Sequence, residues 1–236
     1  MAEFESVREL AKETLMSPAL DGELGVFLWE RAQRLVRSVE YISRLPELAE
    51  GGLRVDRFCL MAAAYFSEAG LACCPESKGR GAKLGFGDVN GEDLPGFSAR
   101  VAEQKLAGVI ETLRIGKIAR IIVESGSRST GMAEAMILAD ARNLDDMGLV
   151  GVLNEYRLCI CRGRGVSEVL QKWKKKTEYR YWQARLEDGF RFEQVRKIAE
   201  QRLCAAEEFM ERLEAEVQGQ DIEWPAVRFA EGRISS

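Results

Sequence analysis

Two polar side chains stand side by side at the end of an apolar segment. The stretch AAAYFSEAG places Ser67 and Glu68 after a run that begins near Phe58, and Gly70 follows them. Such a run is typical of a buried helix, in which a hydroxyl and a carboxylate need hydrogen-bond or charged partners. A carboxylate in this setting can bind a metal or pair with a cation. This turn is therefore a candidate site.

Asp140 is the second candidate, because it lies within the apolar stretch ILADA. A carboxylate among such neighbours is predicted to be partly buried and paired, or else to cap a helix end. Glu124 and Glu134 occupy neighbouring predicted helices. We interpret these two as solvated carboxylates, with a role as metal ligands as the alternative.

The chain contains no histidine. Nucleophilic catalysis by a Ser-His or Cys-His pair is therefore excluded. The cysteines form no CxxC pair, and half of them fall in apolar runs, where a reduced thiol packs like a small hydrophobe. Exposed thiols at Cys73 and Cys74 would be reactive, whereas ordinary surface or half-buried cysteines are the simpler interpretation.

A basic segment near residue 175 suggests a different kind of site. Cations alternate there with aromatic residues, a pattern that suits phosphate contact and base stacking; the candidates are Lys172, Lys174, Lys175, Lys176 and Arg180. The alternative is an amphipathic helix with solvated lysines, in which Trp173 and Trp182 anchor the core. The net charge of -4 favours this alternative, so we do not expect nucleic acid as a partner.

The elements that must position these residues are helices. Apolar residues recur at helical spacing almost throughout, and the strand-like alternation of polar and apolar residues is nearly absent. The predicted helices cover residues 4–15, 24–42, 55–70, 97–113, 115–125, 132–153, 168–186 and 192–217. The fold class is predicted to be all-α.

Composition and length describe an ordinary globular chain. It has 236 residues, 46% hydrophobic and 31% charged, which suffices for one generous domain or two small ones. No apolar stretch approaches the roughly 20 residues that span a bilayer, so no membrane partner is expected. The acidic, amphipathic N-terminus does not resemble a signal peptide, and we expect a cytoplasmic protein. A homo-oligomer remains open.

One segment resembles a known family. The stretch EAMILADARNLDDMGLVGV is similar to the last metal-binding helix of the HD-domain superfamily of metal-dependent phosphohydrolases, commonly EAxxLxDADxLDxxG. Asp140 falls on the final metal-ligand aspartate, and Arg142 replaces the second aspartate. Asp145 and Gly148 follow as the motif requires.

Three further segments resemble the family in order and spacing. Ser67 and Glu68 stand where the family has its His-Asp pair, and Ser125 stands where an isoleucine-rich helix ends in a ligand histidine. Arg31 takes the place of the first ligand histidine, ahead of Arg34-Leu35. The resemblance covers residues 24–153 and implies an HD-like helical bundle. Its former metal-site positions are Arg31, Ser67, Glu68, Ser125 and Asp140.

The resemblance also implies a domain organisation. Residues 1–160 would form the HD-like domain, with a Gly-rich insert near 75–96. Residues 161–220 look like a helical extension found in some bacterial members, packed on that domain, and 221–236 form an irregular tail.

The chemistry that the family performs needs a metal, which lowers the pKa of bound water from about 16 to about 7. Imidazole ligands are missing here, and an arginine has no lone pair to offer. Arg31 could instead pair with Glu68 or Asp140 as a structural clasp. We therefore expect no cofactor and a catalytically inactive binding, regulatory or structural module. The alternative is a divergent phosphohydrolase that holds Mg²⁺ or Mn²⁺ through Glu68 and Asp140 and acts on a nucleotide or another phosphomonoester.

Overall fold

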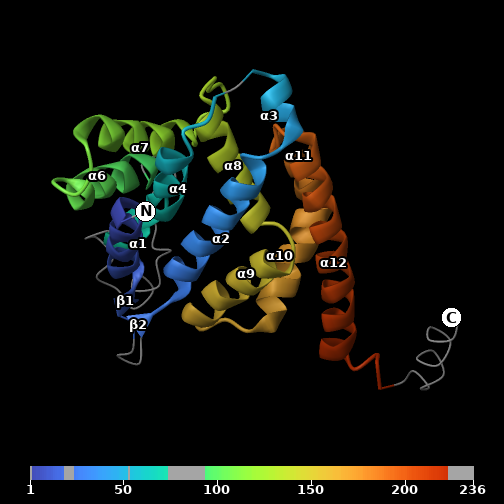
Figure 1. Cartoon of the computed structure of the whole chain (residues 1–236). Coiled ribbons are helices and arrows are strands. Elements are labelled where there is room, and N and C mark those ends of the chain that lie inside the picture. Colours follow the sequence, from blue (N-terminus) through green and yellow to red (C-terminus); the bar gives the residue numbers. More distant parts are fainter. Residues whose placement is uncertain (1, 19–23, 53, 74–93, 223–236) are drawn as a thin grey trace, which may run out of the picture.

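The all-α prediction is confirmed by a computed structural model of the chain, which describes residues 2–18, 24–52, 54–73 and 94–222 (Figure 1). The described strands are β1 (Ser17–Pro18) and β2 (Leu24–Gly25), a short antiparallel pair. No helix in these ranges combines the length and apolarity that crossing a bilayer requires.

The helices of the first part surround the candidate site. They are α1 (Ala2–Leu15), α2 (Phe27–Ile42), α3 (Pro46–Glu50), α4 (Arg57–Phe66), α5 (Ala69–Cys73), α6 (Leu94–Leu106), α7 (Thr112–Glu124) and α8 (Ala133–Asp145). Local chemistry sets several ends: the Asp56 carboxylate accepts the backbone N–H of Cys59 at 3.1 Å and starts α4. Pro46 follows the end of α2, as expected, and also opens α3 as its first residue.

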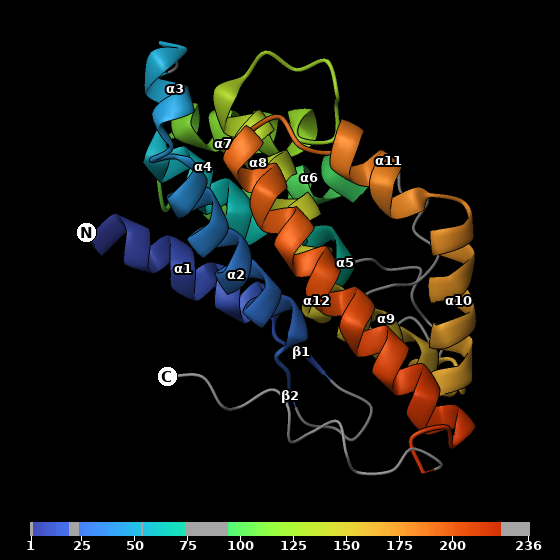
Figure 2. The same ribbon diagram turned by 90° about the vertical axis from the view of Figure 1, so that its right-hand side faces the viewer.

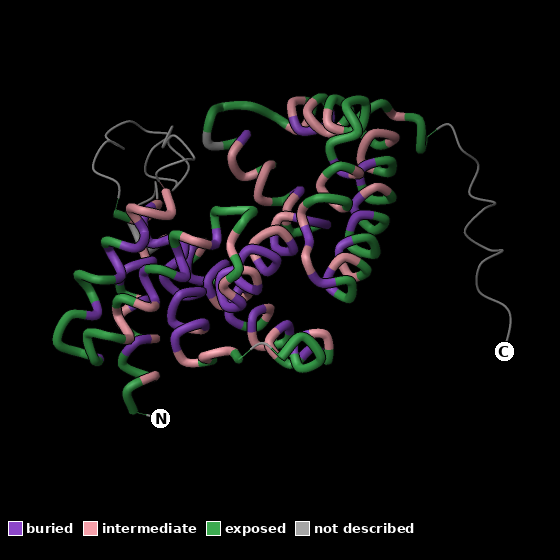
Figure 3. Tube along the Cα trace, turned by 90° about the horizontal axis from the view of Figure 1, so that it is seen from above, coloured by how far each residue is buried: buried purple, intermediate pink, exposed green. Residues whose placement is uncertain are grey.

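The main core lies between α1, α2, α4, α6, α7 and α8, where buried positions concentrate at the centre of the molecule (Figure 3). On α2, buried Leu28, Ala32, Leu35, Val39 and Ile42 form one stripe with spacings of three and four residues. The polar positions of the candidate site therefore lie next to a well-packed apolar centre.

The last part of the chain packs on this core through one long helix and through aromatic side chains that precede it, among them Trp182 and Phe190. It comprises α9 (Leu149–Cys161), α10 (Val166–Glu178), α11 (Tyr181–Asp188) and α12 (Glu193–Gln218). Val195, Ala199 and Leu203 of α12 join the main core, whereas Ala206 and Met210 join α9 and α10 in a second, smaller core. Figure 2 shows α12 running the length of the molecule between α2 and α10. The predicted domain boundary near residue 160 thus falls at the end of α9. The second core joins α9 to α10 and α12, which belong to the predicted C-terminal extension.

Four predicted helices are interrupted. The segment predicted over 97–113 ends at Leu106, and α7 begins at Thr112. The segment predicted over 132–153 divides at Gly148 into α8 and α9. The segment predicted as one helix over 168–186 breaks between α10 and α11 at Arg180, which adopts φ +54°. The segment over 55–70 ends at Phe66, and a turn at Ser67 and Glu68 separates it from α5. Helical periodicity continues across the breaks at Ser67 and Arg180, so the pattern alone could not locate these two. The Gly-rich insert lies mostly outside the described residues, and its last three predicted positions, 94–96, belong to α6.

Gly148 makes the sharp turn between α8 and α9. Its φ is +83°, and a Cβ built there would lie 2.8 Å from the Cβ of Arg202 on α12. Gly148→Ala should therefore lower the free energy of unfolding by at least about 1–2 kcal/mol, the usual cost of a left-handed alanine. Chemical denaturation measures this. Gly116→Ala is the matched control, because Gly116 lies inside α7 with nothing near its Cβ position, and alanine there should be neutral or stabilising.

Candidate functional site

Arg31 is the centre of the candidate site. It projects from α2 and is buried, with 7% of its surface exposed. Its Nη1 lies 2.9 Å from Asp146 Oδ1 and 3.4 Å from Asp145 Oδ2, and its Nε lies 3.7 Å from Glu68 Oε1. One guanidinium thus joins the turn after α4 to the end of α8.

Each of these carboxylates has a second arginine. Arg142 Nε lies 3.2 Å from Glu68 Oε1, and Arg185 Nη2 lies 2.9 Å from Asp146 Oδ2. Arg34 donates from Nε to Asp145 Oδ1 at 2.6 Å and from Nη2 to Oδ2 at 3.2 Å. We call these seven residues the clasp: Arg31, Arg34, Glu68, Arg142, Asp145, Asp146 and Arg185. Four cations against three anions give it one excess positive charge.

The electrostatics of the clasp favour the charged forms of Arg31 and Asp146. Burial by itself lowers the pKa of Arg31, but Glu68, Asp146 and Asp145 outweigh burial and raise that pKa above its ordinary value. For Asp146, burial alone would raise the pKa. The positive charges of Arg31 and Arg185 outweigh burial, so the pKa of Asp146 is lower than its ordinary value. Arg31 therefore remains a cation at any pH at which the protein is folded.

The two serines of the candidate site are buried and bonded within their own helices. Ser67 Oγ donates to the carbonyl of Ala64 at 3.1 Å, and Ser125 Oγ donates to the carbonyl of Ile122 at 2.7 Å. Each hydroxyl thus caps the last turn of its helix where the family resemblance places an imidazole. Ser125 also lines the large pocket described below.

Asp140 is fully buried and has a different partner from the one considered. The backbone N–H groups of Arg191 and Phe192 donate to its Oδ2 at 2.9 and 3.1 Å, and Arg191 Nη1 lies 3.6 Å from its Oδ1. Asp140 therefore contacts the segment that enters α12, and the ion pair with Arg31 that the sequence suggested is not formed. Burial raises the pKa of Asp140 to about 6, because it outweighs the amide bonds and Arg191.

Glu134 corrects one prediction. It is buried rather than solvated: its Oε1 accepts the backbone N–H of Asp56 and lies 2.9 Å from Lys117 Nζ. Its pKa is lowered, since these contacts outweigh desolvation. Glu124 is partly exposed and bonded to Arg120 and Thr130. Both carboxylates are occupied by structural contacts.

The residues present do not fit the metal that the resemblance implies. At one ligand position a permanent cation, Arg31, already neutralises the carboxylates. Glu68 is held by two arginines, and Asp140 Oδ2 accepts two backbone amides while its Oδ1 lies 3.6 Å from Arg191 Nη1. Within the described ranges, no group of three or more His, Cys, Asp or Glu side chains is arranged to hold an ion.

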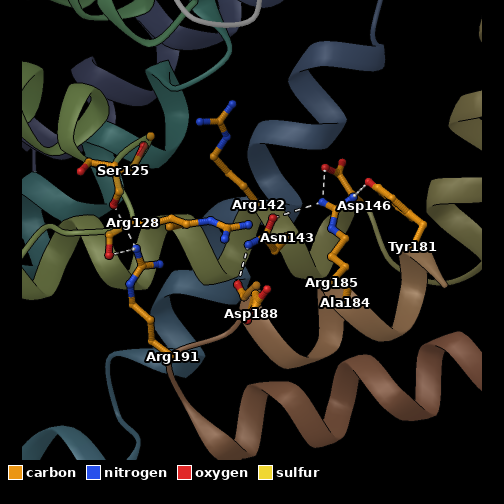
Figure 4. A pocket seen from close by; sticks show the side chains of 14 residues that line it. Ser125, Arg128, Arg142, Asn143, Asp146, Tyr181, Ala184, Arg185, Asp188 and Arg191 are labelled. Atoms are coloured by element: carbon orange, nitrogen blue, oxygen red, sulfur yellow. Dashed lines mark hydrogen bonds and ion pairs between the residues drawn. The ribbon is translucent and has the colours of Figure 1, made fainter. Parts of the chain in front are cut away.

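A pocket of about 430 Å³ opens beside the clasp, between the loop after α7, α8 and α11. Four arginines and two aspartates line it, which leaves two positive charges in excess: Arg128, Arg142, Arg185, Arg191, Asp146 and Asp188. Figure 4 shows the exposed side chain of Arg128 extending across the pocket toward Asn143. We call this the arginine pocket. Sequence reasoning missed it, because Arg185 comes from α11 and Arg191 from the connection between α11 and α12.

The basic segment is largely paired with the protein itself. Lys176 Nζ lies 2.6 Å from Glu155, Lys174 pairs with Glu214, and Lys172 lies 3.9 Å from Glu168. Lys175 lies over the ring of Tyr179, and Arg180 is exposed at the break before α11. The rings of Trp173 and Trp182 contact at 5.0 Å between centroids, with Trp182 buried. These contacts support the structural interpretation of this segment.

Cys59, Cys73, Cys159 and Cys204 are free thiols. Cys59 and Cys159 are buried, and burial raises the pKa of the Cys59 thiol to about 12. Cys73 is exposed, yet partial burial raises its pKa as well. A raised pKa lowers the thiolate fraction, so none of these observations favours a reactive thiol. Cys74 lies outside the described residues.

Comparison with known proteins supports the fold of the chain but identifies no family and no function. No known family model and no curated protein sequence matches the chain. Two solved structures of YpgQ from Bacillus subtilis are similar. The complex of YpgQ with ADP has a TM-score of 0.60 at 16% identity, covering 93% of this chain and 97% of the YpgQ chain. A second YpgQ structure has a TM-score of 0.58 at 18% identity, covering 92% and 97%.

Proposed function

We propose that this chain is a degenerate, non-catalytic HD-domain protein that binds a phosphorylated small molecule in the arginine pocket. The observation that carries the proposal is the buried position of Arg31 among Glu68, Asp145 and Asp146. A guanidinium in the former metal site cannot activate water, but it fixes the carboxylates and ties α2 to α8. The scaffold of the family is thereby kept without its metal.

The arginine pocket supports a binding role. Arg128 makes no ion pair with any residue of the described ranges, and it reaches into a pocket that already carries excess positive charge. The planar guanidinium group of an arginine binds two phosphate oxygens at once through parallel N–H groups. The structurally similar YpgQ has been solved in complex with ADP, which makes a nucleoside diphosphate the first ligand to test.

Arg128→Ala should weaken ADP binding about tenfold or more, because a charge-assisted hydrogen bond is lost without a change in the fold. Isothermal titration calorimetry measures the affinity. Arg54→Ala is the matched control, since Arg54 is exposed and lines neither described pocket. Equal affinity of the wild-type and Arg128→Ala proteins, or no detectable binding of ADP, would contradict this role of the pocket.

The alternative function is a divergent phosphohydrolase that uses Mg²⁺ or Mn²⁺. The observation in its favour is that Glu68 Oε1 and Asp140 Oδ1 are buried and accept no hydrogen bond from the described residues, since carboxylate oxygens suit these ions. Metal analysis of the purified protein and a nucleotide hydrolysis screen in Mn²⁺ separate the two functions. Stoichiometric metal, or turnover that Asp140→Asn abolishes, would overturn the non-catalytic proposal.

A further inference from the structure

A second cavity, of about 380 Å³, lies on another side of the clasp, between α2, α12 and the start of α9. Arg34 and Arg37 of α2, Arg202 of α12 and Asp145 supply its charged lining, and Leu149 and Val150 supply an apolar side. It shares no lining residue with the arginine pocket. We call it the α9 cavity.

The charges of the α9 cavity do not balance. Three arginines face one carboxylate, Asp145, which is also shared with Arg31. Two positive charges are therefore in excess locally, in a chain whose net charge is -4. Burial lowers the pKa of Arg202; the charge of Asp145 opposes this shift and the like charge of Arg34 adds to it, so the lining holds two cations close together. An anion between them would relieve this repulsion.

The arginines also keep unused donors. Arg34 uses Nε and Nη2 for Asp145, and Arg202 uses Nη1 for the carbonyl of Leu144 at 2.7 Å. The remaining N–H groups of both guanidiniums have no hydrogen-bond acceptor among the described residues. Arg37 is exposed and makes no ion pair with any residue of those ranges. A guanidinium offers five donors, so three arginines can hold a phosphate while keeping their present contacts.

The apolar side of the cavity is partly open to solvent. Leu149 is 42% exposed and Val150 37% exposed, beside buried Met147. They form the first turn of α9, whose N-cap, Gly148, has no side chain to satisfy the free amides. The helix start adds a positive partial charge to that of the arginines. An anionic group among the arginines would thus lie next to a surface that favours an apolar substituent.

The geometry points to the α9 cavity as a second binding site, for a small organic phosphate whose phosphoryl group lies among Arg34, Arg37 and Arg202 and whose apolar part covers Leu149 and Val150. This site is independent of the proposed ADP site, because the two linings are separate. Binding here would contact α12 and α2, and so would link a ligand to Arg34 and Asp145 of the clasp.

Titration of the ¹⁵N-labelled protein with phenyl phosphate tests the site, with amide shifts as the readout. The amides of Leu149, Val150 and Ala205 should shift on binding. Arg37→Ala and Arg202→Gln should each weaken this binding about tenfold, because each removes a charged donor. Leu149→Ser should bring the affinity for phenyl phosphate down toward that for inorganic phosphate. Phenol, which lacks the anion, should leave these amides unshifted.

Two controls make the outcome specific. Arg54→Ala tests the loss of one exposed positive charge outside the cavity and should leave the titration unchanged. Arg128→Ala should affect only shifts around the arginine pocket, so the two sites can succeed or fail separately. The inference is overturned if the amides of Leu149 and Val150 do not shift, if both arginine variants bind as tightly as wild type, or if phenol shifts them equally.

Discussion

Arg31→Ala is expected to lower the free energy of unfolding by about 3 kcal/mol, near the lower end of the usual cost of breaking a buried ion pair. The reason is that Glu68, Asp145 and Asp146 lose a shared cation, and two of them are buried. The cost does not rise further, because each carboxylate keeps a second arginine. Urea denaturation, followed by circular dichroism, measures the change.

The matched control for Arg31 is Arg44→Ala. Arg44 also pairs with a carboxylate, that of Glu40, but both side chains are exposed and the pair spans one helical turn. Such a pair contributes little, so the loss should be much smaller. A second variant, Arg31→Met with Glu68→Gln, removes charge from both partners and should recover part of the lost stability. Superimposable denaturation curves for Arg31→Ala and Arg44→Ala would show that the clasp does not stabilise the fold.

The helical architecture could be predicted because apolar spacing reflects burial. The stripe on α2 and the stripe on α12 that includes Val195, Ala199 and Leu203 are legible in the sequence and form the core in the structure. The break at Arg180 could not be predicted, since it depends on a left-handed residue that carries no glycine signal. The breaks after α6 and α8 contain the positive-φ residues Gly108 and Gly148, so these two breaks were missed although the sequence shows a glycine there.

The candidate site could be predicted in part. The family resemblance placed Arg31 in the site, and the rule that a buried charge needs a partner left Glu68 or Asp140 as that partner; the structure has the pair with Glu68. The partners of Asp140 and Asp146 lie some 40 to 50 residues further along the chain, at Arg191 and Arg185. No local pattern reveals such contacts, because they depend on how α11 and α12 return to α8. Glu134 was misassigned for the same reason, since Lys117 reaches it from α7.

Asp140→Ala is expected to lower the free energy of unfolding by about 2–4 kcal/mol at pH 5. It leaves the amides of Arg191 and Phe192 without their acceptor, where the chain enters α12. The effect must depend on pH. The pKa of Asp140 is raised to about 6 by burial, above the unfolded value near 4. Its contribution to stability is therefore greatest below pH 4 and falls as the pH rises through about 6.

The difference in stability between the wild-type and Asp140→Ala proteins should accordingly be smaller at pH 8 than at pH 5, by about 1–1.5 kcal/mol, because roughly half of the free energy of this shift is already lost at pH 5. Denaturation at both pH values measures it, and Glu124→Ala serves as the control, since Glu124 is partly exposed and its pKa is lowered, not raised. A metal-ligand role for Asp140 predicts the opposite dependence, because a cation would hold the carboxylate ionised and lower its pKa. A stability difference that grows from pH 5 to pH 8 would therefore count against the amide-bonded, metal-free role of Asp140 and in favour of the hydrolase alternative.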